Sequence, residues 1–159
     1  MVEQKPKTIR ELRNAGYKPV TVKQEMRKNL VRRIEQGQAH FPGIIGYEDT
    51  VLPHLENAIL SGQDIIFLGE RGQAKSRLIR SLVSLLDDEI PVIAGCEIND
   101  NPFAAICKRC RDLVDTDSHH TEVEWIDRER RYGEKLATPD ITIADLIGEV
   151  DPIRVAEGR

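Results

Sequence analysis

The run GERGQAKS, from Gly69 to Ser76, has the residue types and spacing of a loop that holds phosphate groups. It matches the pattern GxxxxGK(S/T) at every fixed position except one, where Ala74 replaces the second glycine. The backbone N–H groups of such a loop, with the positive end of the helix that follows, can surround the phosphates of a nucleotide. Lys75 would contact the β- and γ-phosphates, and the Ser76 hydroxyl would bind Mg²⁺. The run therefore indicates a site for a nucleoside triphosphate.

Ala74 is the position at which the run departs from the pattern. An alanine held at positive φ would cost roughly 1–2 kcal/mol, whereas an alanine at a helical φ would cost little. The alternative is a chance match in an ordinary loop, but an apolar run precedes this loop and a helical pattern follows it. We expect ATP and Mg²⁺ as cofactors. The residues expected to contact them are Gly69, Glu70, Arg71, Gly72, Gln73, Ala74, Lys75, Ser76 and Arg77.

Hydrolysis of a nucleotide needs an acidic residue at the end of a second strand and a group that orients the attacking water. The apolar run that ends in acidic residues, Leu85 to Glu89, lies at the far end of the helix that the loop begins. We interpret these acidic residues as a solvated helix end and identify no catalytic residue. The chain by itself is expected to bind ATP without hydrolysing it efficiently.

Three cysteines could hold a metal ion. Cys96, Cys107 and Cys110 have the spacing C-x10-C-x2-C, and His119 follows them. Three thiolates and one imidazole make a complete tetrahedral set for structural Zn²⁺. Buried or free thiols and a redox CxxC pair are the alternatives. The odd number of cysteines, in a chain with no export signal, argues against a framework of disulfides.

The elements that would position these residues alternate between helices and short apolar strands. Apolar residues recur in steps of three and four over 8–15, 22–36, 48–60 and 77–86, which predicts helices there. Continuous apolar runs over 64–68 and 91–95 are typical of buried strands. This alternation indicates an α/β fold with a parallel sheet. Weaker patterns predict a helix over 103–114, a strand over 122–126 and a helix over 141–147.

Charge divides the chain after His40. Residues 1–40 carry ten Lys or Arg against four Asp or Glu, and the remaining residues carry thirteen against twenty-three. We interpret residues 1–40 as a basic helical arm packed on an acidic body. A nucleic-acid partner is not expected, because the basic residues are not interleaved with aromatic ones and the net charge is −4. No apolar run is long enough to span a bilayer and the N-terminus is too charged for a signal peptide, so we expect a cytoplasmic protein.

Four segments share features of one protein family: Phe41–Asp49, Asp64–Arg77, Ala137–Asp151 and Ile153–Arg159. They resemble the N-terminal part of an AAA+ ATPase of the magnesium-chelatase type, which includes the ATPase I subunit and its MoxR-like relatives. The resemblance implies a P-loop NTPase core of three layers around a parallel sheet. It also implies that Ile45, Gly46 and Tyr47 line the adenine side of the nucleotide site.

In this family the Walker B strand, the sensor residues, the arginine finger and the helical lid come later in the chain than Arg159 does here. The resemblance therefore implies that residues 41–159 are the N-terminal portion of a nucleotide-binding domain that is incomplete at its C-terminus. The family implies a homo-oligomeric ring or a subunit of a chelatase-like complex. In the intact protein, ATP hydrolysis would be coupled to partner remodelling or metal insertion. The alternative is a non-hydrolysing, nucleotide-responsive or zinc-stabilised interaction subunit that docks onto a partner ATPase.

Overall fold

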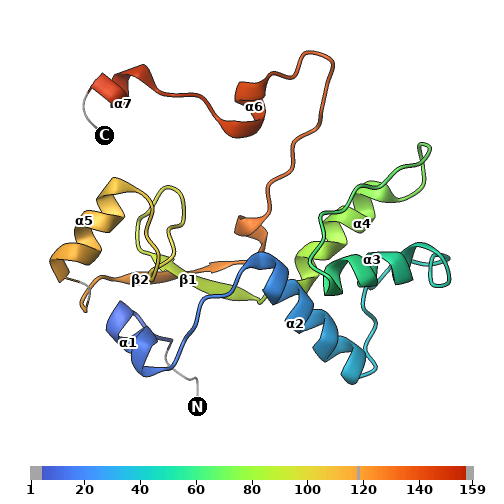
Figure 1. Cartoon of the computed structure of the whole chain (residues 1–159), viewed down its shortest axis with the longest axis horizontal. Coiled ribbons are helices and arrows are strands. Elements are labelled where there is room, and N and C mark those ends of the chain that lie inside the picture. The colour runs from blue at the N-terminus through green and yellow to red at the C-terminus, as the bar shows by residue number, and fades with distance from the viewer. Residues whose placement is uncertain (1–4, 118, 157–159) are drawn as a thin grey trace.

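The computed structural model describes residues 5–117 and 119–156, and over these residues the chain is a mixed α/β protein. Figure 1 shows two groups of helices joined by a two-stranded ribbon, with the last part of the chain running outside both groups. The elements in chain order are α1 (Ile9–Asn14), α2 (Val22–Glu35), α3 (Val51–Leu60), α4 (Lys75–Ser81), the 3₁₀ helix η1 (Leu82–Leu85), β1 (Glu89–Ile93), α5 (Lys108–Asp117), β2 (Val123–Asp127), the 3₁₀ helix η2 (Glu129–Arg131), α6 (Ile143–Ile147) and α7 (Pro152–Ala156).

Side chains cap the first two helices. The Thr8 hydroxyl accepts a hydrogen bond from the Glu11 N–H at 3.2 Å at the start of α1. Thr21 and Gln24 form a reciprocal capping box at the start of α2, with bonds of 3.3 and 3.0 Å. Caps of this kind stabilise a helix by about 1 kcal/mol each. The helices predicted over 8–15 and 22–36 are confirmed, with ends shifted by at most one residue.

The largest apolar cluster lies among α2, α3, α4 and η1. Its buried members are Leu30, Phe41, Ile44, Leu55, Ile59, Leu78 and Leu85. The Asn29 amide donates to the Leu85 carbonyl at 2.9 Å and joins α2 to η1. The helix predicted over 48–60 is confirmed from residue 51 onward, and the one predicted over 77–86 forms as α4 followed by η1. Because Leu78 belongs to this cluster, packing fixes the helix that follows the phosphate-loop sequence.

The sheet differs from the expected one. β1 and β2 are antiparallel, with Ile90 opposite Ile126 and Ile93 opposite Val123. The strands predicted over 91–95 and 122–126 are confirmed with slightly shifted bounds, but the expectation of a parallel sheet is not met among the described residues. The reason lies at the end of β1, where the Ala94 N–H donates to the Glu122 carbonyl at 3.0 Å. The chain therefore returns at the end where β1 stops, and β2 must run back along it.

Residues 64–68, predicted as a strand, belong to none of the strands in the described part of the chain. Ile65 and Phe67 pack against the largest apolar cluster, while Ile66 and Leu68 are 83% and 90% exposed. A strand forms only when a neighbour satisfies its backbone N–H and C=O groups. The apolar pattern identified a partly buried segment, but it carries no information on whether another strand lies beside that segment.

The helix predicted over 103–114 begins later, at Lys108, and ends at Asp117. The Asp100 carboxylate accepts hydrogen bonds from the Ile106 and Cys107 N–H groups at 3.1 and 3.0 Å, which holds the chain before α5 in a non-helical turn. Further on, the helix predicted over 141–147 is confirmed as α6, which begins at a capping box of Thr142 and Asp145.

The two N-terminal helices pack in different places. The Ile9 N–H donates to the Thr121 carbonyl at 3.1 Å, and Ile9 and Leu12 form a second buried cluster with Val123. The single tryptophan, Trp125, donates to the Pro6 carbonyl at 2.9 Å on the same side. In contrast, α2 packs on α3 and η1. The boundary expected after residue 40 stays a prediction.

A buried ion pair joins α2 to η2. Glu25 is 1% exposed, and its carboxylate accepts two hydrogen bonds from the Arg131 guanidinium, at 2.8 and 2.5 Å. It also accepts from the Asp87 N–H at 2.6 Å. Hydrogen bonding to Glu25 raises the pKa of Arg131 above its ordinary value. Three segments that are distant in sequence therefore meet at one carboxylate.

Residues 133–156 leave the body of the molecule, as Figure 1 shows. Ion pairs join this segment to the rest of the chain and within itself, with Arg80 to Glu134 at 2.7 Å and Lys135 to Asp145 at 3.0 Å. Its exposed large apolar side chains are Leu136, Ile143, Leu146, Ile147, Val150, Ile153 and Val155. None of the helices within 5–117 and 119–156 has the length and apolar character needed to cross a membrane.

Candidate functional site

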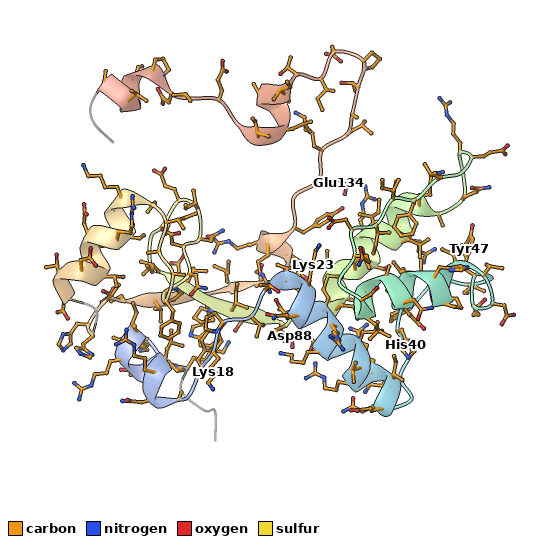
Figure 2. The ribbon with its side chains drawn as sticks, viewed as in Figure 1. Lys18, Lys23, His40, Tyr47, Asp88 and Glu134 are labelled. Atoms are coloured by element: carbon orange, nitrogen blue, oxygen red, sulfur yellow. The ribbon has the colours of Figure 1, made fainter. Side chains whose placement is uncertain are left out.

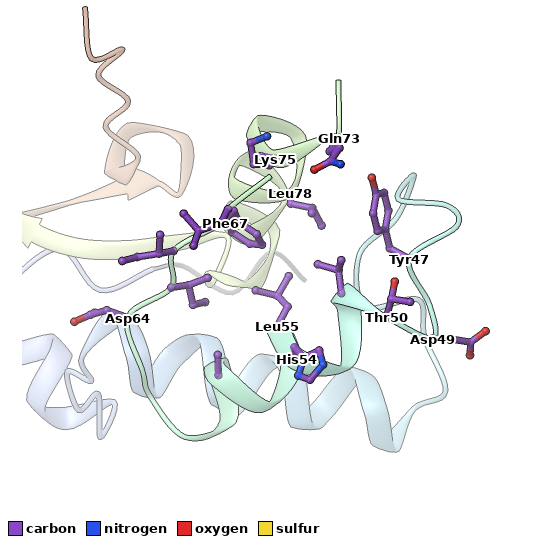
Figure 3. Close-up of a pocket in the computed structure, with 15 residues that line it drawn as sticks. Tyr47, Asp49, Thr50, His54, Leu55, Asp64, Phe67, Gln73, Lys75 and Leu78 are labelled. Atoms are coloured by element: carbon purple, nitrogen blue, oxygen red, sulfur yellow. The ribbon is translucent and has the colours of Figure 1, made fainter. Parts of the chain in front are cut away.

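A cavity of about 710 Å³ lies between the phosphate-loop sequence and the start of α3. Figure 3 shows Lys75 and Gln73 on the loop side and Tyr47, Thr50 and His54 on the α3 side. Its lining residues are Tyr47, Asp49, Thr50, Val51, His54, Leu55, Ala58, Asp64, Ile65, Ile66, Phe67, Leu68, Gln73, Lys75 and Leu78. The volume is within the range of about 300–1,000 Å³ that is usual for small-molecule sites.

Lys75 is folded back over the loop. Its ammonium group donates to the Gly69 carbonyl at 2.8 Å and also to the Glu70 carbonyl. A lysine ammonium is a compact charge with three donors, so it can exchange these carbonyl oxygens for the oxygens of a phosphate. The side chain is half-buried at the first residue of α4, so its position is fixed at one end by the helix.

Three residues of the loop over 69–74 have positive φ: Gly69, Gly72 and Ala74. Gly69 has φ 153° and Gly72 has φ 84°. A Cβ atom at position 69 would lie 2.0 Å from the Gln73 side-chain oxygen, so a larger residue would displace Gln73 from the cavity. Gly69 and Gly72, the two glycines expected to supply flexibility, therefore occupy positions with backbone angles that favour glycine.

Ala74 adopts the left-handed conformation, with φ 53° and ψ 16°, immediately before α4. We expect Ala74→Gly to raise the free energy of unfolding by about 1 kcal/mol, because glycine has no Cβ to strain this conformation. Urea unfolding followed by Trp125 fluorescence would measure the change. The matched control is Ala58→Gly inside α3, which should lower stability by about 1 kcal/mol. A loss of stability in both variants would contradict the left-handed assignment.

The residues expected on the adenine side are only partly brought together. Tyr47 lines the cavity, whereas Ile45 is 84% exposed and lies, with Gly46, outside its lining. A Cβ atom at Gly43 would lie 2.9 Å from the Arg77 guanidinium, so the segment before α3 closely approaches the first turn of α4. Sequence reasoning missed Thr50, the N-cap residue of α3, and His54 in the first turns of that helix. Their one signal was their place at the start of the helix predicted just after Tyr47.

The charged groups around the loop are unevenly placed. Ser76 is exposed on the first turn of α4, outside the cavity lining, as are Glu70 and Arg71 in the loop. At the other end of the cavity, Asp64 pairs with Lys23 at 2.8 Å. A hydrogen bond from Lys23 lowers the pKa of Asp64 below its ordinary value. The lining therefore has one lysine, Lys75, at the loop, and two carboxylates, Asp49 before α3 and the already paired Asp64 at the far end.

The acidic residues at the end of η1 bond elsewhere. Asp87 pairs with Lys28 at 2.8 Å, and Asp88 pairs with Arg128 at 2.9 Å. Figure 2 shows Asp88 near α2, away from Tyr47. The structure thus places neither carboxylate in the cavity beside Lys75, as the interpretation of a helix end expected.

The three cysteines come together, but with a different fourth group from the expected one. Ligand atoms of Cys96, Asp100, Cys107 and Cys110 all lie within 4.8 Å of one another. His119 is not part of this group, because it follows the C-terminal end of α5 while Cys107 and Cys110 stand at the N-terminal end. About nine residues of helix separate the two ends by roughly 14 Å. The spacing of the cysteines gave no indication that Asp100 lies beside them.

Hydrogen bonds surround this group. The Cys96 sulfur accepts from the Asp100 N–H, and the Cys107 sulfur accepts from the Cys110 N–H, each at 3.3 Å. Burial raises the pKa of the Cys96 thiol, but hydrogen bonds from the Asp100 and Ile98 backbone and from the other two cysteines together outweigh burial and hold that pKa below its ordinary value. Burial, with hydrogen bonds to the other two cysteines, raises the pKa of Cys110.

Part of the chain is similar to a curated protein. It is 35% identical over 75 residues to the protein named "Magnesium-chelatase subunit ChlI homolog" of Methanocaldococcus jannaschii. The aligned residues are 45% of this chain and 20% of that protein, so the chain spans about a fifth of the length of the relative it matches. No protein-family model matches the chain, and no solved structure matches it. The similarity indicates a partial relationship to chelatase-type proteins.

Proposed function

We propose that the chain binds a nucleoside triphosphate with Mg²⁺ in the cavity beside residues 69–76, as the N-terminal part of a chelatase-type AAA+ ATPase. One observation carries the proposal: the ammonium of Lys75 is held over the loop at the cavity that Tyr47 also lines. A nucleotide needs a cation for its phosphates and an apolar or aromatic surface for its base. The partial similarity to a magnesium-chelatase homolog supports the same class.

Each residue of the loop has a separate task in this proposal. Lys75 holds the phosphate oxygens, and Gly69 and Gly72 let the backbone N–H groups approach them. The Ser76 hydroxyl, exposed on the first turn of α4, is the group that would bind Mg²⁺. A bound Mg²⁺ ion would neutralise part of the negative charge of the phosphates. Tyr47 would contact the base.

The P-loop NTPase core with a parallel sheet belongs to this proposal. Residues 64–68 would be its first strand, because they are a continuous apolar run that leads into the loop and carry exposed Ile66 and Leu68. The strands beside it would come from sequence that follows these residues in a longer protein, consistent with a match to a fifth of the relative. The same longer sequence would supply the residues for hydrolysis, ring assembly and action on a partner.

A titration of the 159-residue chain with a fluorescent ATP analogue tests the proposal. We expect saturable binding at one site that requires Mg²⁺ for full affinity and is displaced by unlabelled ATP. We expect no turnover above the level of the buffer. Absence of binding by folded protein, at analogue concentrations up to the millimolar range, would refute the proposal.

A second function is favoured by the cysteine group. In it the chain is an interaction subunit that a metal ion stabilises and that docks onto a partner ATPase, with the loop sequence no longer used for nucleotide. The specific observation is the convergence of Cys96, Asp100, Cys107 and Cys110 on one place. Metal-dependent folding together with no nucleotide binding in the titration would select this function over the first.

A further inference from the structure

Four potential metal ligands from three consecutive pieces of chain meet at one end of the ribbon. Cys96 follows β1, Asp100 lies in the next turn, and Cys107 and Cys110 stand at the start of α5. Cys96 and Cys110 are 7% and 0% exposed, and Asp100 is 3% exposed. The buried Asp100 carboxylate accepts one backbone hydrogen bond on each oxygen, and each oxygen retains a lone pair that can bind a metal ion beside the three thiols.

The spacing of the ligand atoms suits one ion. Tetrahedral Zn²⁺ with Zn–S bonds of about 2.3 Å holds its thiolates about 3.8 Å apart. The four ligand atoms lie within 4.8 Å of one another, so they need to close by no more than about 1 Å. An iron–sulfur cluster distributes its thiolates over two or more iron ions and therefore spreads the set of sulfurs further apart. The group has the size of a mononuclear site.

The surrounding backbone is already arranged to support thiolates. N–H groups of Asp100 and Cys110 point at the sulfurs of Cys96 and Cys107, each at 3.3 Å. Asn99, with φ 54°, makes the sharp turn that brings the Asp100 N–H back to Cys96. Backbone N–H groups of Ile106 and Cys107 fix the two carboxylate oxygens of Asp100. Outer hydrogen bonds of this kind orient metal ligands and tune their affinity.

Charge and access also fit a metal ion. Three thiolates and a carboxylate carry −4, so Zn²⁺ would leave the site at −2, and Lys108 and Arg109 lie between the two ligands of the CxxC step. Arg109 is anchored by a bond to the Gly95 carbonyl at 2.7 Å. A cavity of about 770 Å³ is lined by Cys96 and Cys107 and gives a path from solvent. The buried apolar cluster here is small, with Ile93 as its one large aliphatic member among the buried residues.

We infer that Cys96, Asp100, Cys107 and Cys110 bind one structural Zn²⁺ ion that fastens the end of β1 to the start of α5. The fourth ligand is the Asp100 carboxylate and not the His119 imidazole. The ion joins the turn over residues 96–107 to the helix, where the apolar cluster alone is small. This inference is independent of nucleotide binding, because the cluster and the cavity beside Lys75 have no residue in common.

Metal analysis of the full chain, purified under reducing conditions, is the first test. We expect close to one equivalent of zinc per chain, and slow reaction of the three thiols with a thiol reagent until a chelator is added. Co²⁺ in place of zinc should give the strong visible absorption of a tetrahedral site and a thiolate-to-metal band. Folded, metal-free protein with three reactive thiols and no Co²⁺ uptake would overturn the inference. Iron in place of zinc would overturn the choice of metal.

Paired variants test which residue is the fourth ligand. Asp100→Ala should weaken Zn²⁺ binding by about 100-fold or more in competition with a coloured chelator, because it removes a ligand and not only its support. His119→Ala should bind Zn²⁺ as the unchanged chain does. The reverse ranking would overturn the Asp100 assignment. If Asp100→Ala fails to fold, the Co²⁺ spectrum of His119→Ala decides, since an unchanged spectrum excludes His119 as a ligand and a changed one restores it.

Discussion

Lys75→Met is expected to weaken the binding of Mg-ATP by a factor of roughly 100, which corresponds to about 2.7 kcal/mol. The ammonium of Lys75 is the only cation in the lining of the described cavity, and it is already held over the loop by the Gly69 and Glu70 carbonyls. Hydrogen bonds to charged groups contribute about 1.5–3 kcal/mol each, and methionine keeps the length of the side chain without the charge. The fluorescent-analogue titration measures the change.

Lys18→Met is the matched control, because it makes the same substitution at an exposed residue between α1 and α2. Figure 2 shows Lys18 well away from Tyr47 and the phosphate-loop side of the molecule. We expect this variant to bind nucleotide as the unchanged chain does. Equal losses in the two variants would mean that the analogue binds by general charge attraction, and the assignment of Lys75 would be wrong.

Glu25→Ala should lower the free energy of unfolding by about 3–5 kcal/mol. The substitution leaves the Arg131 guanidinium, whose side chain is 10% exposed, without the two hydrogen bonds that satisfy it. It also leaves the Asp87 N–H without its acceptor. A buried charge that loses its partner retains the full penalty of desolvation. Urea unfolding followed by far-UV circular dichroism measures the loss.

Two further variants show whether burial of the pair is the cause. The double variant Glu25→Leu with Arg131→Met should recover most of the loss, because it removes both charges and keeps their volume. Glu134→Ala breaks an exposed pair with Arg80, whose side chains are 63% and 44% exposed, and should change stability by less than about 1 kcal/mol. Losses of similar size in Glu25→Ala and Glu134→Ala would contradict this account.

Local signals in the sequence predicted the helices well. Apolar patterns over 22–36 and 141–147 predicted α2 and α6. The structure adds capping boxes of Thr21 with Gln24 and of Thr142 with Asp145, which the prediction did not use. Such signals depend on residues within one turn of each other, so the sequence contains all the information needed. The same holds for Lys75, whose bonds to the loop involve residues five and six positions before it.

Contacts between distant residues could not be predicted in this way. The pairing of β1 with β2 depends on the direction in which the chain returns after α5. A continuous apolar run indicates a buried strand but does not fix the direction of its neighbour. The prediction that His119 joins the three cysteines differs from the structure for a related reason. His119 suits zinc by its chemistry, but the length of α5 carries it away, and a turn brings Asp100 in its place.

The apolar run of residues 64–68, which pairs with no strand among the described residues, leads directly into Gly69. A strand that docked along this run and a nucleotide that bound at the loop would both restrict the same short piece of backbone. Whichever bound first would order this backbone, so the second would lose less conformational entropy on binding. The strand and the nucleotide would therefore bind cooperatively. By thermodynamic reciprocity, the factor by which the docked strand raises nucleotide affinity equals the factor by which nucleotide raises the affinity for the strand. Nucleotide occupancy would thus report on assembly of the sheet.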